Sequence, residues 1–265
     1  MKIKVGTLCS GYDSQCMALD RLKENFPNFD YELVFWSEID KYAIQAHNAV
    51  YPQYADRNLG DMTKIDWAKV DKVDLLTYST PCTDISNAGQ KKGIEKGSGT
   101  RSSILWYTEE AIRILRPKYL LMENVSALVS QKFLPYFHEW QNVVAGYGYS
   151  NFTQVLNAKD YGVPQNRERV FMISILKGNY HFPKPFKLER RLKDVLESNV
   201  EEKYYLTDTM IKCFENRTRI AKEKGNGFRF NPTDGGGYAK AITTCAGNRT
   251  DDNFIIDEQA TTKND

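Results

Sequence analysis

The chain has 265 residues, 41% of them hydrophobic and 26% charged, with a formal net charge of +2. This length and balance are typical of one large core, or of a large domain with a small appendage. The start, MKIKVGTLCSGYDS, lacks the apolar run of a signal peptide, and no stretch approaches the ~20 apolar residues of a membrane helix. We therefore expect a cytoplasmic protein rather than a secreted or membrane-spanning one.

Short apolar runs alternate with amphipathic segments along the first part of the chain. The pattern predicts helices over residues 14–26 and 101–117, between strands at 3–9, 31–37, 73–79 and 118–122. Strands separated by helices indicate a parallel sheet with right-handed crossovers. Two further apolar runs, 152–158 and 169–176, lie close together in sequence, and we expect them to pair as an antiparallel hairpin at one edge.

The character of the chain changes after Lys177, where it becomes charged and loses the alternation. This change predicts two parts, a domain over residues 1–180 and a smaller, irregular region over 181–265. Residues 177–229 hold thirteen Lys/Arg against eight Asp/Glu, and residues 87–101 hold four against one. Such segments are either solvated faces or contacts to a polyanion, and composition alone does not decide between the two.

The cysteines lie far apart in the sequence. They are five in number, at positions 9, 16, 82, 213 and 245, with no CxxC pair. An odd, scattered set is unlike a disulfide framework or a zinc site, and it is typical of a reducing compartment. We expect no bound metal.

Polar residues recur at the ends of the expected strands, where open parallel sheets bind their ligands. The turn SGYDS follows the first strand, Glu38 follows the second, and Pro81-Cys82 and Glu123 follow later ones, with Asp61 supplied by NLGDM. Each residue also has a plainer interpretation. Gly11 could serve only a tight turn, Glu38 could cap a helix, and Asp61 could close a turn. The ordered set nevertheless predicts a site for a nucleoside-containing cofactor, although SGYDS is not a GxGxxG motif.

A second group of residues points to chemistry. Glu123 follows the apolar run KYLLM, so we expect its carboxyl to be partly desolvated, as suits a proton donor. In PQNRERVFMISI, Gln165, Arg167 and Arg169 are spaced by two and would project from one face of a strand. That face would be either an ordinary charged surface or the wall of a cleft that holds a phosphate or a carbonyl oxygen.

A thiol, a carboxylic acid and two guanidiniums beside a nucleoside site suit attack on an electron-poor heterocycle, of which cytosine is an example. C5 of cytosine is a poor nucleophile. Addition of the Cys82 thiolate at C6, with protonation of N3 by Glu123, would turn C5 into an enamine carbon able to attack an electrophilic methyl group.

These motifs together resemble the DNA cytosine-C5 methyltransferases, a family that uses S-adenosyl-L-methionine. The resemblance runs in order through LCSGYDS, SEIDKYA, GDM, PCTDIS, TRSSILWY, ENV and QNRER, from about residue 3 to 177, with a weaker match near 235–256. It implies a Rossmann-like methyltransferase fold of the α/β class, with a mostly parallel sheet, an antiparallel edge hairpin and a small irregular target-recognition region. Departures from the usual motifs are Leu8 for Phe, Asp13 for Gly and Thr83 for Gln.

The resemblance also implies roles for individual residues. Cys82 would be the nucleophile, and Glu123 would be the acid that protonates N3. Arg169 would hold cytosine O2, and Arg167 would contact the backbone of the DNA. The implied cofactor site comprises Leu8, Ser10, Gly11, Tyr12, Asp13, Glu38, Ile39, Asp61, Met62, Ser103 and Ile104.

Double-stranded DNA is the implied partner. The glycine-dotted, basic loop after Cys82 would close over a cytosine flipped out of the duplex, and the basic segment after residue 180 would read bases. The implied DNA contacts are Ser86, Gln90, Lys91, Lys92, Arg101 and Gln165.

One departure leaves alternatives open. The family usually has a further C-terminal segment that closes the cofactor pocket, and this chain ends at Asp265 without it. We therefore expect either an enzyme that a second polypeptide completes, or a small member that acts alone, in a restriction–modification or phage setting. The alternatives are a tRNA cytosine-C5 methyltransferase and a truncated, non-catalytic relative.

Overall fold

The structure is a computed structural model that describes residues 2–81, 101–225, 229–242 and 249–257. Several predicted site residues lie outside these ranges, namely Cys82, Ser86, Gln90, Lys91 and Lys92, and only the backbone of Arg101 is described. Within the described part, no helix is long and apolar enough to cross a membrane.

The chain divides into two compact units. The first comprises Met1–Leu156 and Arg169–Pro183, and the second comprises Asn157–Glu168 and Lys184–Asp265. The chain thus passes between the units three times, at 156/157, 168/169 and 183/184, whereas the sequence pattern predicts one boundary near residue 180.

A six-stranded sheet forms the centre of the first unit, in the order β2-β1-β3-β4-β7-β5. The first four strands in that order are parallel to one another. They are β2 (Asp30–Ser37), β1 (Lys2–Leu8), β3 (Leu75–Tyr78) and β4 (Tyr119–Val125). β7 (Glu168–Ile175) runs antiparallel to β4, and β5 (Ser150–Asn157) lies beside β7 at the edge. The expected mixed α/β fold with a mostly parallel sheet is confirmed.

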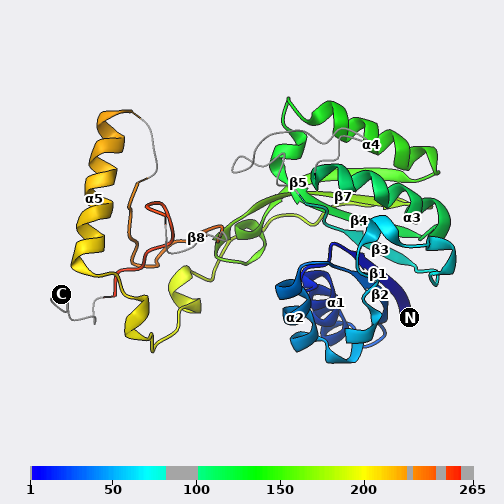
Figure 1. Cartoon of the computed structure of the whole chain (residues 1–265), viewed down its shortest axis with the longest axis horizontal. Coiled ribbons are helices and arrows are strands. Elements are labelled where there is room, and N and C mark those ends of the chain that lie inside the picture. The colour runs from blue at the N-terminus through cyan, green and yellow to red at the C-terminus, as the bar shows by residue number, and fades with distance from the viewer. Residues whose placement is uncertain (1, 82–100, 226–228, 243–248, 258–265) are drawn as a thin grey trace. The chain divides into compact units, whose positions relative to one another are not determined.

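Four α-helices lie in the described residues of the first unit. They are α1 (Ser14–Asn25), α2 (Lys41–Val50), α3 (Thr108–Leu115) and α4 (Leu134–Gly146). Figure 1 shows α1 and α2 beside β1 and β2, and α3 and α4 beside the other half of the sheet. Short 3-10 turns connect these elements: η1 (Pro52–Arg57), η2 (Met62–Lys64), η3 (Trp67–Lys69), η4 (Arg101–Tyr107) and η5 (Ser126–Val129).

Two buried apolar clusters hold the helices to the sheet. The smaller packs α1 and α2 against β1 and β2 through residues such as Cys16, Leu33 and Trp36. The larger packs α3 and α4 against β3, β4 and β7, with Trp140 at 0% exposure near its centre. A register shift between Val5 and Gly6 leaves one residue of β2 without a partner, so that strand supplies side chains to both clusters.

β4 is longer than the apolar run KYLLM predicts. Its pairing with β7 continues to Val125, opposite Arg169, so Glu123 lies inside the strand and not after it. The antiparallel partner supplies hydrogen bonds that sequence hydrophobicity does not reveal. Asp61 likewise follows no strand, because only an isolated bridge between Trp36 and Asn58 precedes it.

The expectation that Gln165, Arg167 and Arg169 share one strand is wrong. Gln165 and Asn166 form β6, which pairs in parallel with β8 (Ala239–Lys240) in a separate two-stranded sheet, whereas Arg169 belongs to β7. Arg167 lies between the two strands and belongs to neither.

The second unit contains these two short strands, the 3-10 turns η6 (Ala158–Tyr161), η7 (Leu192–Val195) and η8 (Glu202–Tyr204), and the helix α5 (Asp208–Glu223). The sequence pattern does not predict α5, because Phe214 is its one buried residue. The rings of Phe214, Phe230 and Phe254 pack against one another, with centroids 5.1–5.6 Å apart for the three pairs. These three aromatic rings form a small core. Capping by Thr207, which accepts from the Met210 N–H, was a sequence signal for the helix start.

Gly6 is predicted to be essential for the packing of β1. A Cβ built on it would lie 2.3 Å from the Phe35 Cζ, and that ring belongs to the buried cluster. We expect Gly6→Ala to lower the free energy of unfolding by about 1–3 kcal/mol, measured by urea denaturation. Gly146→Ala is the matched control, because a Cβ there meets nothing within 4 Å in a helix. Equal stability of the two variants would contradict this packing.

Candidate functional site

The turn after β1 has an unusual backbone. Cys9, Gly11 and Asp13 all have positive φ, at 51°, 59° and 66°. The turn is closed by the Asp13 N–H, which donates to the Ser10 carbonyl at 2.9 Å, and it is tied to β2 by the Ser10 N–H, which donates to the Ser37 carbonyl at 3.2 Å. Two of the three residues are not glycine, so contacts around the turn must offset the cost of the left-handed conformation.

Glu38 meets this turn from the end of β2. Its Oε2 accepts from the Gly11 N–H at 3.0 Å, and its Oε1 accepts from the N–H groups of Ile39 and Asp40. Asp40, and not Glu38, caps α2 by accepting from the N–H groups of Tyr42 and Ala43. The helix-cap interpretation of Glu38 is therefore wrong, and its carboxylate instead joins two predicted cofactor segments.

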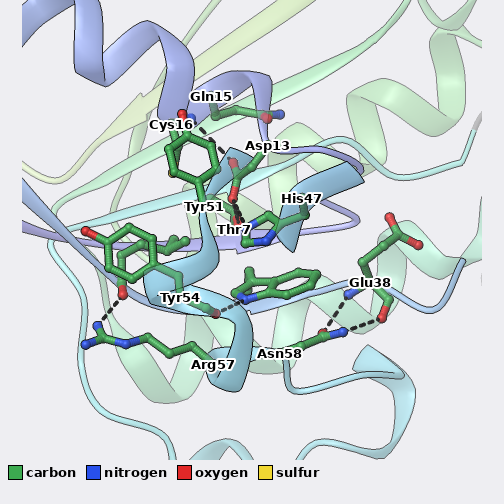
Figure 2. A network of polar contacts seen from close by, with 12 residues as sticks. Thr7, Asp13, Gln15, Cys16, Glu38, His47, Tyr51, Tyr54, Arg57 and Asn58 are labelled. Carbon is green, nitrogen blue, oxygen red and sulfur yellow. Dashed lines mark hydrogen bonds and ion pairs between the residues drawn. The ribbon is translucent and has the colours of Figure 1, made fainter. Parts of the chain in front are cut away.

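Asn58 fixes Glu38 and was not singled out from the sequence. Its Oδ1 accepts from the Glu38 N–H at 3.2 Å, and its Nδ2 donates to the Glu38 carbonyl at 3.1 Å, as Figure 2 shows. An asparagine in the middle of RNLGDM carries no pattern that distinguishes it from a turn residue.

Apolar side chains stand exposed around Glu38. Ile39 is 68% exposed, Tyr12 is 51% exposed, and Tyr42, which the sequence does not single out, is 67% exposed. Exposed side chains of this size beside a carboxylate suit a ligand with one flat apolar face and one hydroxylated edge.

The remaining predicted cofactor residues lie in several kinds of environment. Leu8 and Met62 are buried, and the Cys9 thiol donates to the Met62 sulfur at 3.6 Å. Asp61 begins η2 and accepts from the Thr63 hydroxyl and N–H, and these hydrogen bonds hold the pKa of its carboxyl below the usual value. Ser103 is buried and Ile104 is half-buried, both in η4.

Ser10 carries an unused polar atom. Its Oγ is buried and has no hydrogen-bond partner among the described residues. Buried polar groups are nearly always hydrogen-bonded. The Ser10 hydroxyl is therefore available for a hydrogen bond to a polar group of a ligand bound at this turn.

Glu123 and Arg169 form an ion pair. Arg169 Nε lies 2.9 Å from Glu123 Oε1, and the two side chains are 22% and 26% exposed. The strand register brings them together, because Arg169 lies opposite Val125, two residues beyond Glu123 on β4. Glu123 is thus held by a guanidinium, as the structural interpretation of the sequence requires, and both side chains remain partly exposed.

Asn124 connects this pair to the segment before Cys82. It is buried, and its Nδ2 donates to the Thr80 carbonyl at 3.1 Å while its Oδ1 accepts from the Val125 N–H. The chain therefore leaves β3 along a fixed path as far as Pro81. Cys82 itself lies outside the described residues.

Asn157 performs a similar role in the second unit. Its Oδ1 accepts from the Arg167 N–H at 3.0 Å, and its Nδ2 donates to Asn166 Oδ1 at 2.6 Å. The Arg167 carbonyl accepts from the Ala158 N–H. Asn157 therefore closes the loop that carries the half-buried Gln165 and Arg167, and nothing in the sequence pattern marked it.

A basic cleft lies beside α5 in the second unit. It has a volume of about 590 Å³ and is lined by Thr218, Lys222, Arg229, Phe230, Asn231, Lys240 and Asp251. Lys222 and Arg229 form no ion pair with another described residue, so their charges face solvent or a ligand. No group of three or more His, Cys, Asp or Glu in the described ranges could hold a metal ion.

Comparison with known proteins gives consistent matches. The family model described as C-5 cytosine-specific DNA methylase matches residues 3–264. The type II methyltransferase M2.ScrFI of Lactococcus lactis subsp. cremoris is 42% identical over 196 residues, which cover 72% of this chain and 54% of the relative. The orphan methyltransferase M.SssI of Spiroplasma monobiae is 40% identical over 184 residues, which cover 68% and 47%. The chain thus spans about half the length of these curated relatives.

A solved structure shares the fold at low sequence identity. The S. pombe Dnmt2 methyltransferase superposes with a TM-score of 0.66 at 17% identity, over 92% of this chain and 71% of that one. This match shows the Rossmann-like methyltransferase fold and nothing about the substrate.

We expect Cys9 to be unreactive. Burial, with the nearby Glu38 and Asp61 carboxylates, raises the pKa of the Cys9 thiol from 9.0 to about 12. At pH 8 about one such thiol in 10⁴ is ionised, against about one in ten for an unshifted thiol, and the thiolate is the nucleophile. Iodoacetamide should therefore alkylate the exposed Cys213 long before Cys9 in the native protein, as read by peptide mass spectrometry. Equal rates at the two sites would contradict this environment.

Proposed function

The chain belongs to the C-5 cytosine-specific DNA methylase family, and on that premise we propose that it methylates C5 of cytosine in double-stranded DNA, with S-adenosyl-L-methionine as methyl donor. One observation carries the proposal. The Gly11–Glu38 contact and Glu123 lie toward the carboxyl ends of the parallel strands β1, β2 and β4, and the antiparallel strand β7 brings Arg169 at its amino end to the same edge of the sheet. Ligands of such sheets bind at that edge.

The cofactor would lie against the turn after β1. Glu38 would accept from ribose hydroxyls, Ile39 would pack on the adenine ring, and Asp61 would accept from the adenine amine. The orphan Ser10 hydroxyl and the open space at Gly11 support this assignment, because both suit a polar ligand close to the backbone. Leu8, Tyr12, Met62, Ser103 and Ile104 complete the proposed site, and Asp13 belongs to it as part of the turn, with its side chain buried. When bound, the cofactor supplies an electrophilic methyl group.

The residues of this chain would make cytosine C5 reactive. The Cys82 thiolate adds to C6 while Glu123 gives a proton to N3, so the C5–C6 double bond opens and C5 becomes an enamine carbon. C5 then takes the methyl group from the sulfonium of the donor, which leaves as the neutral thioether. Loss of the C5 proton to a base, expulsion of the Cys82 thiolate and return of the N3 proton to Glu123 restore both the ring and the protein. Arg169 would orient Glu123 and hold cytosine O2.

The DNA would contact residues from both parts of the chain. In the first 180 residues these are Ser86, Gln90, Lys91, Lys92, Arg101 and Gln165. Arg167 would contact the backbone of the DNA. Residues 181–265 would form the target-recognition region. The basic cleft beside α5 supports this role, because Lys222 and Arg229 can bind phosphate groups of the DNA.

The named relatives support a microbial setting. M2.ScrFI is a type II methyltransferase, and M.SPRI, at 31% identity, is an orphan methyltransferase of Bacillus phage SPR. We propose a restriction–modification or phage role in the cytoplasm of a prokaryotic cell or phage-infected host. Because the chain spans about half the length of its relatives, a second polypeptide that completes the site is part of the test below.

Trapping of a covalent adduct tests the proposed function. DNA that contains 5-fluorocytosine holds the enzyme on C6, because the fluorine cannot leave as a proton does. We expect labelled cofactor and this DNA to give an adduct with the wild type and with Cys213→Ala, whose thiol is exposed, and none with Cys82→Ala. Each protein is assayed alone and with a C-terminal fragment of a relative.

The outcomes of this assay separate the alternatives. No adduct with any DNA, even with the added fragment, would refute the proposal and leave a non-catalytic relative. An adduct with 5-fluorocytosine tRNA in place of DNA would assign the tRNA activity instead.

Glu123 can be tested separately from Cys82. Glu123→Gln keeps an oxygen for Arg169 but cannot give up a proton to N3. We expect the rate of methyl transfer to fall by about 10²–10⁴-fold, while cofactor affinity stays unchanged. Glu139→Gln, on α4, is the control and should retain full activity. A Glu123→Gln enzyme with the wild-type rate would remove Glu123 from the mechanism.

A further inference from the structure

Asp13 places a fully buried carboxylate directly beneath the proposed cofactor turn. Its Oδ2 accepts from the Thr7 hydroxyl at 2.9 Å, and its Oδ1 accepts from the Cys16 N–H at 3.4 Å as the cap of α1. Its backbone is left-handed, with φ at 66°. A non-glycine residue holds such a conformation only where its surroundings stabilise it, and the two hydrogen bonds of the side chain do so.

The same carboxylate also reaches α2. His47 Nε2 lies 3.7 Å from Asp13 Oδ2, and both side chains are 0% exposed. The His47 ring stacks on Trp36 of β2, with ring centroids 3.7 Å apart and the planes 17° apart. Figure 2 shows Thr7, Asp13 and His47 close to one another. The carboxylate therefore contacts β1, the start of α1 and the middle of α2.

These contacts are separate from the one that Glu38 makes with the turn. Glu38 holds the turn through the Gly11 N–H, and its own chain continues into Asp40, the cap of α2. Asp13 holds the other end of the turn and contacts the same helix. The turn is thus connected to segment 38–40 through Glu38 and to α2 through Asp13 and His47.

We propose that Asp13 is a positioning residue for cofactor binding, which fixes the turn after β1 relative to Glu38 and α2. The inference rests on the proposed function, since it assumes that this turn and Glu38 hold the cofactor. It adds a role for a buried acid that cannot touch the cofactor, because Asp13 is 0% exposed. Without the carboxylate the turn loses its side-chain bonds to Thr7 and Cys16, and the Gly11 N–H loses its fixed orientation toward Glu38.

Cofactor affinity of the full chain, measured by calorimetry without DNA, tests the proposal. Asp13→Gly is the decisive variant, because glycine adopts a φ of 66° without strain and only the carboxylate is lost. We expect its Kd for S-adenosyl-L-methionine to rise about tenfold, the size expected for losing hydrogen bonds to a buried charge.

Asp20→Asn is the matched control. Asp20 accepts from the hydroxyls of Tyr31 and Tyr51 at 2.7 Å, next to the same apolar cluster, yet it has no contact with the turn. Its loss should lower Tm while the Kd stays within about twofold of the wild type. A role for Asp13 in stability alone would move Tm but leave Kd unchanged.

Thr7→Val supplies a second test, because it removes only the hydroxyl that donates to Asp13. We expect a weaker Kd in the wild-type background and no further loss in the Asp13→Gly background, since Thr7 acts through Asp13. This variant decides the matter if Asp13→Gly does not fold, and an unchanged Kd would then overturn the proposal.

The remaining outcomes are also decisive. An Asp13→Gly protein within about threefold of the wild-type Kd, or an Asp20→Asn protein that loses as much, overturns the role of Asp13. If the wild type binds no cofactor, the proposed cofactor site itself fails. If the wild type binds and the variants match it, only the positioning role fails.

Discussion

The parallel pairing of β1 with both β2 and β3 is the constraint on which the site depends. Because all three strands run the same way, their carboxyl ends meet at one edge, and the turn after β1 comes within reach of Glu38. The start of the sheet is held by Asp74, whose backbone and side chain bond to Lys4 and whose carbonyl accepts from the Tyr119 N–H. Close approach of β1 and β2 requires Gly6, because the Phe35 ring occupies the space where a Cβ would lie.

Buried polar side chains then fix the irregular backbone at that edge and, within the second unit, in the loop before β7. Asp13 anchors the turn after β1, Asn124 anchors the segment that follows β3, and Asn157 closes the loop before β7. Each uses its side-chain oxygen or nitrogen to satisfy backbone groups that no strand pairs. Buried backbone groups without partners are costly, so short polar side chains at these places serve both stability and the shape of the site.

The antiparallel strand β7 decides where the charged side chains lie. It extends β4 by continuing the ladder to Val125, and its register brings Arg169 to Glu123. A surface ion pair contributes little to stability, so the value of this pair lies in orientation. The same strand begins where the chain returns from the second unit, and Gln165 and Arg167 therefore belong to another sheet.

The sequence by itself determined the strands of a mostly parallel sheet and the residues at the first turn, because alternating apolar runs and a glycine between strand and helix act over a few neighbouring residues. It also determined the family, because the motifs follow one another in the expected order. Only the tertiary structure decided that Glu123 lies inside β4, that Gln165 and Arg169 belong to separate sheets, and that α5 forms on a single buried ring. It also decided the roles of Asn58, Asn124 and Asn157. Each of these outcomes depends on a partner far away in the chain, and hydrophobic periodicity contains no information about such partners.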